Sequence, residues 1–212
     1  MLSTVIITLN EKRNIERCVL SAQKVSDEVI VVDSFSTDRT EEICRQIGVR
    51  FFQEEWKGYS AAKNFGNSLA TNEWILSLDA DEEITDVLAE EIRVALNKND
   101  REAYWIPRMT NYCGKWIKHG GWYPEKHIRL FRKTNVRWNE DEVHEDVEIT
   151  GETGTLKNPM LHYSIRSISE HVQKAEKYST LSALKMKRKG KRASFVKLYL
   201  GPLFKFWNDY LS

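Results

Sequence analysis

The sequence predicts an α/β protein with a mixed, mostly parallel sheet, flanked by helices and followed by a C-terminal helical extension. Two observations support this fold class. Apolar runs short enough for buried strands alternate with amphipathic segments over the first hundred residues. After residue 100, strand-like runs are separated by Gly- and Trp-rich loops, and the chain closes on a basic, aromatic-rich segment. Regular alternation of this kind is typical of parallel strands joined by crossover helices.

The elements of the first hundred residues follow from their hydrophobic spacing. Ile15, Cys18, Val19 and Ala22 recur at i, i+3, i+4 and i+7, the pattern of a helix with one buried face. Gly48 is placed to end the second helix. The expected order is strand 5–7, helix 15–22, strand 29–32, helix 40–46, strand 49–52, helix 60–70, strand 74–78 and helix 85–97.

The remaining elements are predicted from shorter signals. Strands are expected over 103–107, 127–131, 147–150 and 160–164, and the Gly-containing segment 150–154 reads as a hairpin connection. Ser167 and Glu170 form a capping box that opens a helix reaching about Arg188.

Composition and charge limit the classes of function that this chain can have. The 212 residues can bury a sizeable core and hold 32 basic against 31 acidic residues. The charge is uneven, because residues 185–212 carry eight Lys/Arg and one Asp whereas the first 184 carry 24 basic and 30 acidic residues. We therefore expect an acidic body with a basic tail and no nucleic-acid partner. Three cysteines show no CxxC spacing, and Cys18 and Cys44 fit buried thiols in a reducing compartment.

Polar side chains follow three of the predicted strands, at the edge of the sheet where open α/β proteins bind ligands. Asn10 follows the first strand, Asp33 the second, and Asp79 and Asp81 the fourth. Asn10 could instead cap the first helix, and Asp38 could cap the second. Two carboxylates one residue apart at a strand end favour a bound divalent cation, Mg²⁺ or Mn²⁺, that carries a phosphorylated ligand. The coincidence of three polar strand ends predicts a nucleotide site.

Four motifs occur in an order that resembles the family 2 glycosyltransferases, which have the Rossmann-like GT-A fold. They are Thr-Leu-Asn-Glu at 8–11, Val-Val-Asp-Ser-Phe-Ser-Thr-Asp-Arg-Thr at 31–40, Ala-Ala-Lys-Asn-Phe-Gly at 61–66 and Leu-Asp-Ala-Asp-Glu at 78–82. The resemblance covers about the first 165 residues. It implies a catalytic domain over 1–165, with a nucleotide-sugar-binding half (1–100) and an acceptor half (101–165), and a separate extension over 166–212.

The resemblance implies a UDP-sugar donor and assigns residues to it. Asp33 would contact the uracil or ribose, and Asp79 would approach the ribose and the metal that Asp81 ligates directly. The other implied donor contacts are Thr8, Asn10 and Glu11 around the nucleoside, and Lys63 and Asn64 near the base or phosphates.

The second half is similar to a narrower group, the lipopolysaccharide-core glucosyltransferases. The similarity rests on Asn-Tyr-Cys-Gly-Lys-Trp at 111–116, Gly-Trp-Tyr-Pro at 121–124, Arg-Leu-Phe at 129–131, Val-His-Glu at 143–145 and Leu-His-Tyr at 161–163. It implies inverting transfer of a hexose to a cell-envelope glycan. Glu145, or else Asp146, would be the base that deprotonates the acceptor hydroxyl, since burial or neighbouring charge can raise a carboxylate's pKa toward that role. The competing interpretation is a solvated acidic loop.

Three further assignments follow from side-chain chemistry. His162 either completes the metal shell or hydrogen-bonds the diphosphate, unless it is structural. Arg129 is a candidate phosphate contact, because a guanidinium pairs with phosphate oxygens bidentately. Trp122 and Tyr123 lie in a Gly-rich loop and offer aromatic faces for an acceptor sugar.

The C-terminal segment joins a dense basic run to a series of aromatic and aliphatic residues, the pattern of an interfacial membrane anchor. We expect a cytoplasmic enzyme in peripheral contact with the inner face of the membrane. A helix packed on the body or an oligomer contact are the alternatives. For the whole chain, two rival functions are a non-catalytic nucleotide-sugar-binding protein and a metal-dependent phosphohydrolase, which also places Asp-x-Asp at a strand end.

Overall fold

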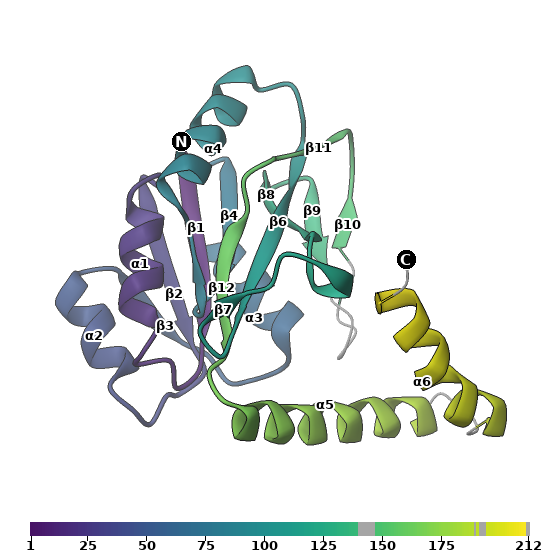
Figure 1. The fold of residues 1–212 in the computed structure, drawn as a ribbon. Helices are drawn as coiled ribbons and strands as arrows, with labels where there is room; N and C mark the ends of the chain where they lie inside the picture. Colours follow the sequence, from purple (N-terminus) through teal and green to yellow (C-terminus); the bar gives the residue numbers. More distant parts are fainter. Residues whose placement is uncertain (140–146, 189, 191–193, 211–212) are drawn as a thin grey trace.

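A computed structural model describes residues 1–139, 147–188, 190 and 194–210 of the chain. One sheet runs through it in the order β3-β2-β1-β4-β8-β6-β12-β5, with β7 and β11 also paired to β6, while β9 and β10 pair with each other (Figure 1). The strands are β1 (Leu2–Thr8), β2 (Glu28–Asp33), β3 (Arg50–Gln53), β4 (Trp74–Asp79), β5 (Glu82–Glu83), β6 (Ala103–Tyr112), β7 (Lys115–Trp116), β8 (Glu125–Arg132), β9 (Val136–Trp138), β10 (Val147–Ile149), β11 (Thr153–Thr155) and β12 (Met160–Ile165). The helices are α1 (Ile15–Gln23), α2 (Thr40–Ile47), α3 (Tyr59–Leu69), α4 (Asp86–Lys98), the short 3₁₀ helix η1 (Gly120–Trp122), α5 (Ile168–Arg188) and α6 (Phe195–Tyr210).

The predicted parallel half is confirmed. β3, β2, β1 and β4 are neighbours and all parallel, so their carboxyl ends meet at one edge. β1 is buried along its whole length, which explains why its sequence does not alternate between apolar and polar residues. We call this common edge the strand-end edge; it is the lower edge in Figure 1.

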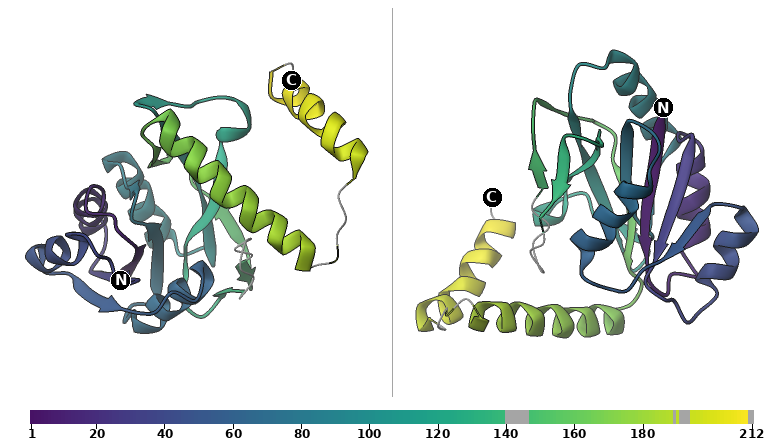
Figure 2. Two further views of the ribbon diagram at one scale, coloured as in Figure 1. Left: turned by 90° about the horizontal axis from the view of Figure 1, so that it is seen from below. Right: turned by 180° about the vertical axis from the view of Figure 1, so that it is seen from behind.

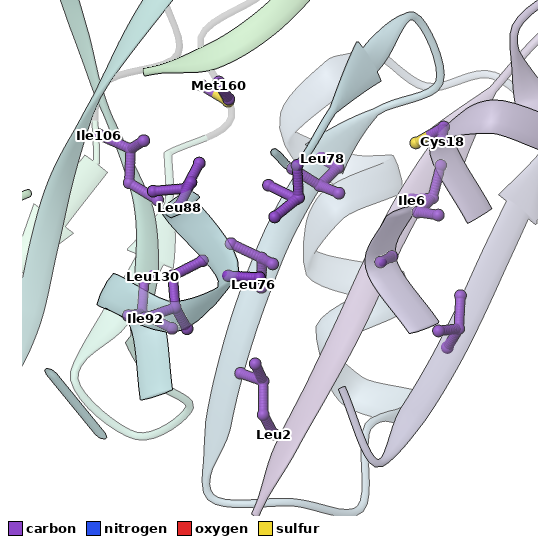
Figure 3. Close-up of a cluster of buried hydrophobic side chains, with 14 of the residues drawn as sticks. Leu2, Ile6, Cys18, Leu76, Leu78, Leu88, Ile92, Ile106, Leu130 and Met160 are labelled. Carbon is purple, nitrogen blue, oxygen red and sulfur yellow. The ribbon is translucent and has the colours of Figure 1, made fainter. Parts of the chain in front are cut away.

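Two hydrophobic clusters cover the two faces of the sheet. On one face the cluster joins α1, α2 and α4 to the sheet, and Leu76, Leu88 and Ile92 are completely buried there (Figure 3). On the other face α3 packs on β1 and β2, and β9 packs against α3. Cys18 and Cys44 are buried as predicted. Truncating one of these leucines to Ala would cost about 2–5 kcal/mol, because the surrounding side chains cannot close the cavity completely.

Close packing fixes the height of α3 above the sheet. A Cβ atom added to Gly66 would lie 3.1 Å from Cγ2 of Val32 and would overlap the side chain of Val5. The helix therefore approaches β1 and β2 more closely than a side chain at residue 66 would allow.

The mixed half differs from the prediction at one connection. β8 runs antiparallel to both β4 and β6, and β12 is parallel to β6. Segment 150–154 was predicted as a hairpin connection, which is wrong, because β10 pairs with β9 whereas β11 pairs with β6. The glycines mark a crossing between two sheets, and Gly151 adopts a φ of 107°, a conformation that an L side chain would strain.

The C-terminal part is helical, as expected. The Ser167 hydroxyl accepts the Glu170 N–H (3.1 Å) and caps α5 as predicted, whereas the Glu170 carboxylate accepts the N–H of Arg166 (3.0 Å), one residue before the partner that a capping box would use. α5 crosses beneath the strand-end edge, and α6 lies beyond its far end (Figures 1 and 2). Among the described residues, no helix combines the length and apolar character needed to cross a bilayer.

Candidate active site

The loops that follow β1 and β2 are tied together at the strand-end edge. The Asn10 N–H donates to the Ser36 hydroxyl (2.7 Å), and the Asn10 side-chain oxygen accepts the Thr37 N–H (2.8 Å). Asn10 has a φ of 57°, in the left-handed region that Asn tolerates better than most residues. Asn10 therefore joins the two loops, and it does not cap the first helix.

Asp33 and Asp38 are both engaged within these loops. Asp33 is completely buried, and its carboxylate accepts hydrogen bonds from the Ser36 N–H (2.8 Å) and hydroxyl (2.5 Å). Asp38 accepts the Thr40 N–H (3.0 Å) at the start of α2, as the capping interpretation expected. Thr8 is also buried at the end of β1.

Asp79 lies in a network of charged side chains inside the protein. Its carboxylate is 2.7 Å from the Arg129 guanidinium and 3.5 Å from the Lys63 ammonium, and the same Arg129 nitrogen is 2.7 Å from Glu82. Lys63, Glu82 and Arg129 are almost completely buried. Burial alone would raise the pKa of Asp79, but Arg129 and Lys63 hold it well below its usual range.

These contacts bear on two donor assignments. Arg129 was predicted to contact phosphate, yet the structure directs its guanidinium to two carboxylates. Asn64 was predicted near the base or phosphates, and its amide instead donates to the Trp138 carbonyl (2.8 Å) and accepts the Trp138 N–H (3.2 Å), joining α3 to β9.

A cavity of about 300 Å³ opens at the strand-end edge on the side of α1 and α5. It combines four cationic side chains with four carboxylates, so it is suited to a ligand that carries both charge and hydrogen-bonding groups. Its lining residues are Asn10, Glu11, Lys12, Arg13, Asn14, Asp38, Asp81, Tyr163, Ser164, Arg166, Glu170 and Lys174.

Glu170 pairs with Lys174 at 3.1 Å, but among the described contacts the cavity carboxylates Glu11 and Asp81 lack a Lys or Arg partner as close as the one that Asp79 has. Burial and the neighbouring charge of Asp81 raise the pKa of Glu11, against the hydrogen bond that Glu11 receives from the Asn14 amide (2.6 Å). Two carboxylates that oppose each other's ionisation favour a cation between or beside them.

Asp81 and His162 form a pair on one side of this cavity. The His162 Nε2 lies 3.3 Å from the Asp81 carboxylate, and Nδ1 lies 3.2 Å from the Thr110 hydroxyl. Such a hydrogen bond to the second ring nitrogen orients metal-ligating histidines. Within the described residues, no group of three His, Cys, Asp or Glu side chains is arranged to hold a metal ion. The pair therefore fits a cation that takes its remaining ligands from phosphate and water, as Mg²⁺ commonly does.

α5 closes the cavity with residues that the sequence analysis did not select. The Arg166 guanidinium donates to the Asn14 side-chain oxygen (2.8 Å), and the Lys174 ammonium donates to the Ser164 carbonyl (2.5 Å). Arg166, Glu170 and Lys174 are spaced four residues apart, hence on one side of the chain where it enters α5. That spacing, directly after a strand end, was the signal available in the sequence.

The predicted acceptor loop carries a cluster of aromatic rings. The Trp122 ring, 40% exposed, meets Tyr112 edge to face at 5.9 Å, and the Tyr112 hydroxyl lies 3.0 Å from the His171 ring nitrogen on α5. Tyr123 follows directly, at the end of η1. The predicted base residues, Glu145 and Asp146, lie outside the described residues.

Comparison with known proteins identifies the family. Residues 3–150 match the model of glycosyl transferase family 2. The chain belongs to this family.

Family 2 relatives and structures of the same fold support this assignment. The chain is 31% identical to the lipopolysaccharide core biosynthesis glycosyltransferase LpsC of Rhizobium meliloti, over 99% of this chain and 80% of LpsC. It is 34% identical to an uncharacterized glycosyltransferase of Rickettsia prowazekii, over 93% of this chain and 72% of the relative.

Two solved structures are similar in fold at 16% sequence identity. One is S. aureus TarS in complex with UDP-GlcNAc (TM-score 0.61, covering 80% of this chain and 60% of that one). The other is glucosyl-3-phosphoglycerate synthase from Mycobacterium tuberculosis with Mn²⁺, UDP and phosphoglyceric acid (TM-score 0.56, covering 92% and 80%). The predicted GT-A fold and the glycosyltransferase activity are therefore confirmed, in preference to a phosphohydrolase or a non-catalytic binding protein.

In this family 2 glycosyltransferase, the structure brings some of the predicted site residues together and separates others. Asn10, Glu11, Asp81 and the neighbouring His162 gather at the cavity. Lys63, Asp79 and Arg129 form the adjacent internal network, which lies behind β4.

Proposed function

We propose that this glycosyltransferase transfers a hexose from a UDP-sugar, with inversion and with a divalent metal, to a cell-envelope glycan such as the lipopolysaccharide core. The observation that carries the proposal is the cavity lined by four cationic side chains and by Asp81, whose carboxylate is paired with the neighbouring His162. This combination suits a nucleoside diphosphate, whose anionic oxygens need both a metal and basic partners.

The donor nucleoside would lie over the joined loops after β1 and β2. Thr8, Asn10, Glu11 and Asp33 remain the proposed contacts, with Asp33 toward the uracil or ribose. The UDP complexes of TarS and glucosyl-3-phosphoglycerate synthase, which share the fold, support UDP as the nucleotide.

Asp81 and His162 would hold the metal, and Mn²⁺ in the mycobacterial structure supports a divalent cation. When bound, the metal would act as a Lewis acid toward the diphosphate leaving group. Asp79, with its carboxylate already neutralised by Arg129 and Lys63, would position the Asp79–Asp81 turn and approach the ribose.

Arg166 and Lys174 are additional proposed contacts for the departing diphosphate. Both line the cavity from α5, opposite the loop that carries Lys12 and Arg13. Cations fixed in a partly enclosed site stabilise the charge that develops on a leaving group, because little reorganisation is needed at the moment of reaction.

The acceptor hydroxyl requires a base, and Glu145 remains our first candidate and Asp146 the second, on sequence alone. Single displacement by that hydroxyl would convert an α-linked donor sugar into a β-linkage. Trp122 and Tyr123 would contact the acceptor, and the name of LpsC supports a lipopolysaccharide-core acceptor. Such an acceptor is consistent with an enzyme on the cytoplasmic side of the membrane.

Calorimetric titration of UDP with and without Mn²⁺ tests the donor site. We expect Mn²⁺-dependent binding by the wild-type chain, its loss in Asp81→Asn, and its retention in Asp86→Asn, which alters an exposed aspartate on α4. Turnover with a panel of UDP-sugars would then identify the sugar, and Glu145→Gln and Asp146→Asn would identify the base by loss of turnover with UDP binding retained. A folded wild-type chain that binds another nucleotide but not UDP would refute the UDP assignment.

A further inference from the structure

Helix α6 presents a broad apolar face to solvent. Phe195, Tyr199, Leu203 and Phe206 occur at i, i+4, i+8 and i+11, which places them on one face of the helix. Phe195 is 78% exposed, and Trp207 extends the face at 68%. Soluble surfaces rarely expose so many large apolar side chains together, so this face marks an interaction site.

The opposite face of α6 is polar or small. Gly201, Lys205 and Asn208 are spaced by four and three residues and lie together on it. α6 is 16 residues long, which corresponds to about 24 Å at 1.5 Å per residue, less than the ~30 Å hydrocarbon core of a bilayer. A short helix with one apolar and one polar face is suited to lying in the plane of an interface.

The charge of the preceding segment indicates which partner covers the apolar face. Between residues 185 and 192, six of eight residues are Lys or Arg. Each basic residue close to an anionic lipid surface strengthens partitioning about fivefold. A second copy of the chain would bring another basic run and not an acidic partner, so the charge favours an anionic lipid surface over a dimer.

We propose that α6, together with Lys187 and Arg188 at the end of α5, forms a docking surface for an anionic lipid bilayer, with the apolar face of α6 inserted among the lipid headgroups. α6 approaches η1, which ends in Trp122. Docking would therefore hold the acceptor loop at the membrane surface and select acceptors in which the glycan is attached to a lipid. The selection of lipid-linked acceptors rests on the function proposed above, whereas the docking itself does not.

Vesicle flotation with the full-length chain tests the proposal. The probes are vesicles of phosphatidylcholine alone and vesicles with 30 mol% phosphatidylglycerol. We expect the wild-type chain to float with the anionic vesicles at least tenfold more than with the neutral ones. Leu203→Glu should reduce flotation at least tenfold, whereas Asn208→Glu, which adds the same charge to the polar face, should retain it. Lys187→Gln with Arg188→Gln should weaken anionic binding about 25-fold, as expected from two lost cations.

Two outcomes would overturn docking. One is a wild-type chain that does not float with anionic vesicles. The other is a dimer in light scattering that Leu203→Glu dissociates, since a second copy would then cover the face. UDP binding measured on each variant separates these results from a failure of the donor site, because neither Leu203 nor Asn208 contacts the cavity. A docked enzyme that uses a glycan and its lipid-linked form equally well would overturn the acceptor step alone.

Discussion

The strand-end edge holds two groups of carboxylates that the structure treats differently. Asp79 and Glu82 are paired inside the protein with Arg129, and Lys63 also lies beside Asp79. Glu11 and Asp81, on the other side of β4, face a cavity whose cations come from separate elements. The comparison shows that two carboxylates separated by one residue can have different roles. Asp79 orders the turn after β4, and Asp81 is available to a ligand.

The largest expected effect is on the internal group. Arg129→Met should lower the free energy of unfolding by about 3–5 kcal/mol, because Glu82 would be left as a buried charge without Arg129 and the partly buried Asp79 would lose its closest cation. Urea denaturation would measure it. Arg93→Met, which removes an exposed i, i+3 pair with Glu90, should change stability by no more than about 0.5 kcal/mol. Equal effects of the two substitutions would show that the internal pairing does not stabilise the fold.

The cavity group should behave in the opposite way. Asp81→Asn should reduce transferase turnover by at least about a hundredfold, since replacing even groups that only support a metal ligand costs 10–100-fold. The free energy of unfolding should change little, because among the described contacts the Asp81 carboxylate pairs with His162 at 3.3 Å and has no close Lys or Arg partner. Turnover and urea denaturation on the same preparation would test both statements. A large loss of stability would place Asp81 in the internal group instead.

The cations of α5 should have an intermediate effect. Arg166→Met or Lys174→Met should each weaken UDP binding about tenfold, the lower end of what a hydrogen bond to a charged group contributes. Calorimetry would measure the change, and Lys98→Met, an exposed lysine at the end of α4, is the control. Unchanged affinity in both α5 variants would exclude this side of the cavity from the donor site.

The smallest effect concerns acid stability next to the internal group. The His127 imidazole, 3.2 Å from the Glu125 carboxylate, and Arg108 together lower the pKa of Glu125 from 4.5 to about 2. Because the folded state has the lower pKa, the stabilisation is complete above pH 4.5 and is lost as the pH falls toward 2. Glu125 is 40% exposed, so screening limits the contribution to about 1 kcal/mol.

Glu125→Gln should therefore lower stability by about 1 kcal/mol at pH 7 and converge with the wild type near pH 2. Denaturation over this pH range would measure it. Parallel curves separated by a constant amount would show that the loss does not arise from the ionised carboxylate.

Much of the fold was readable from the sequence because its signals are local. Continuous apolar runs identified β1, β2 and β4, and their parallel order then brought the polar strand ends together. The connection 150–154 was misjudged because glycines mark a change of direction without indicating which strand comes next. The short β9 gave no periodicity long enough to detect.

The site was less predictable because its closure depends on contacts between distant parts of the chain. The hydrogen bond between Arg166 and Asn14 joins residues 152 positions apart, so no local sequence pattern predicts it. Similarly, Arg129 looked like a phosphate ligand in sequence because its acidic partners, Asp79 and Glu82, belong to an element about 50 residues earlier. Side-chain chemistry identified the charged residues but not whether their partners were internal.

The link between Asn10 and the loop after β2 has a consequence for how fast the enzyme works. Each residue that must become ordered on binding costs about 1–2 kcal/mol of backbone conformational entropy. Here Asn10 donates its N–H to the Ser36 hydroxyl and accepts the Thr37 N–H, so the two loops are held together by the fold itself. The conformational entropy of ordering these two loops is therefore lost during folding and not during binding. A nucleotide that binds at Asn10 would meet a surface that is already ordered. Successive rounds of donor capture and product release can then proceed without refolding these loops.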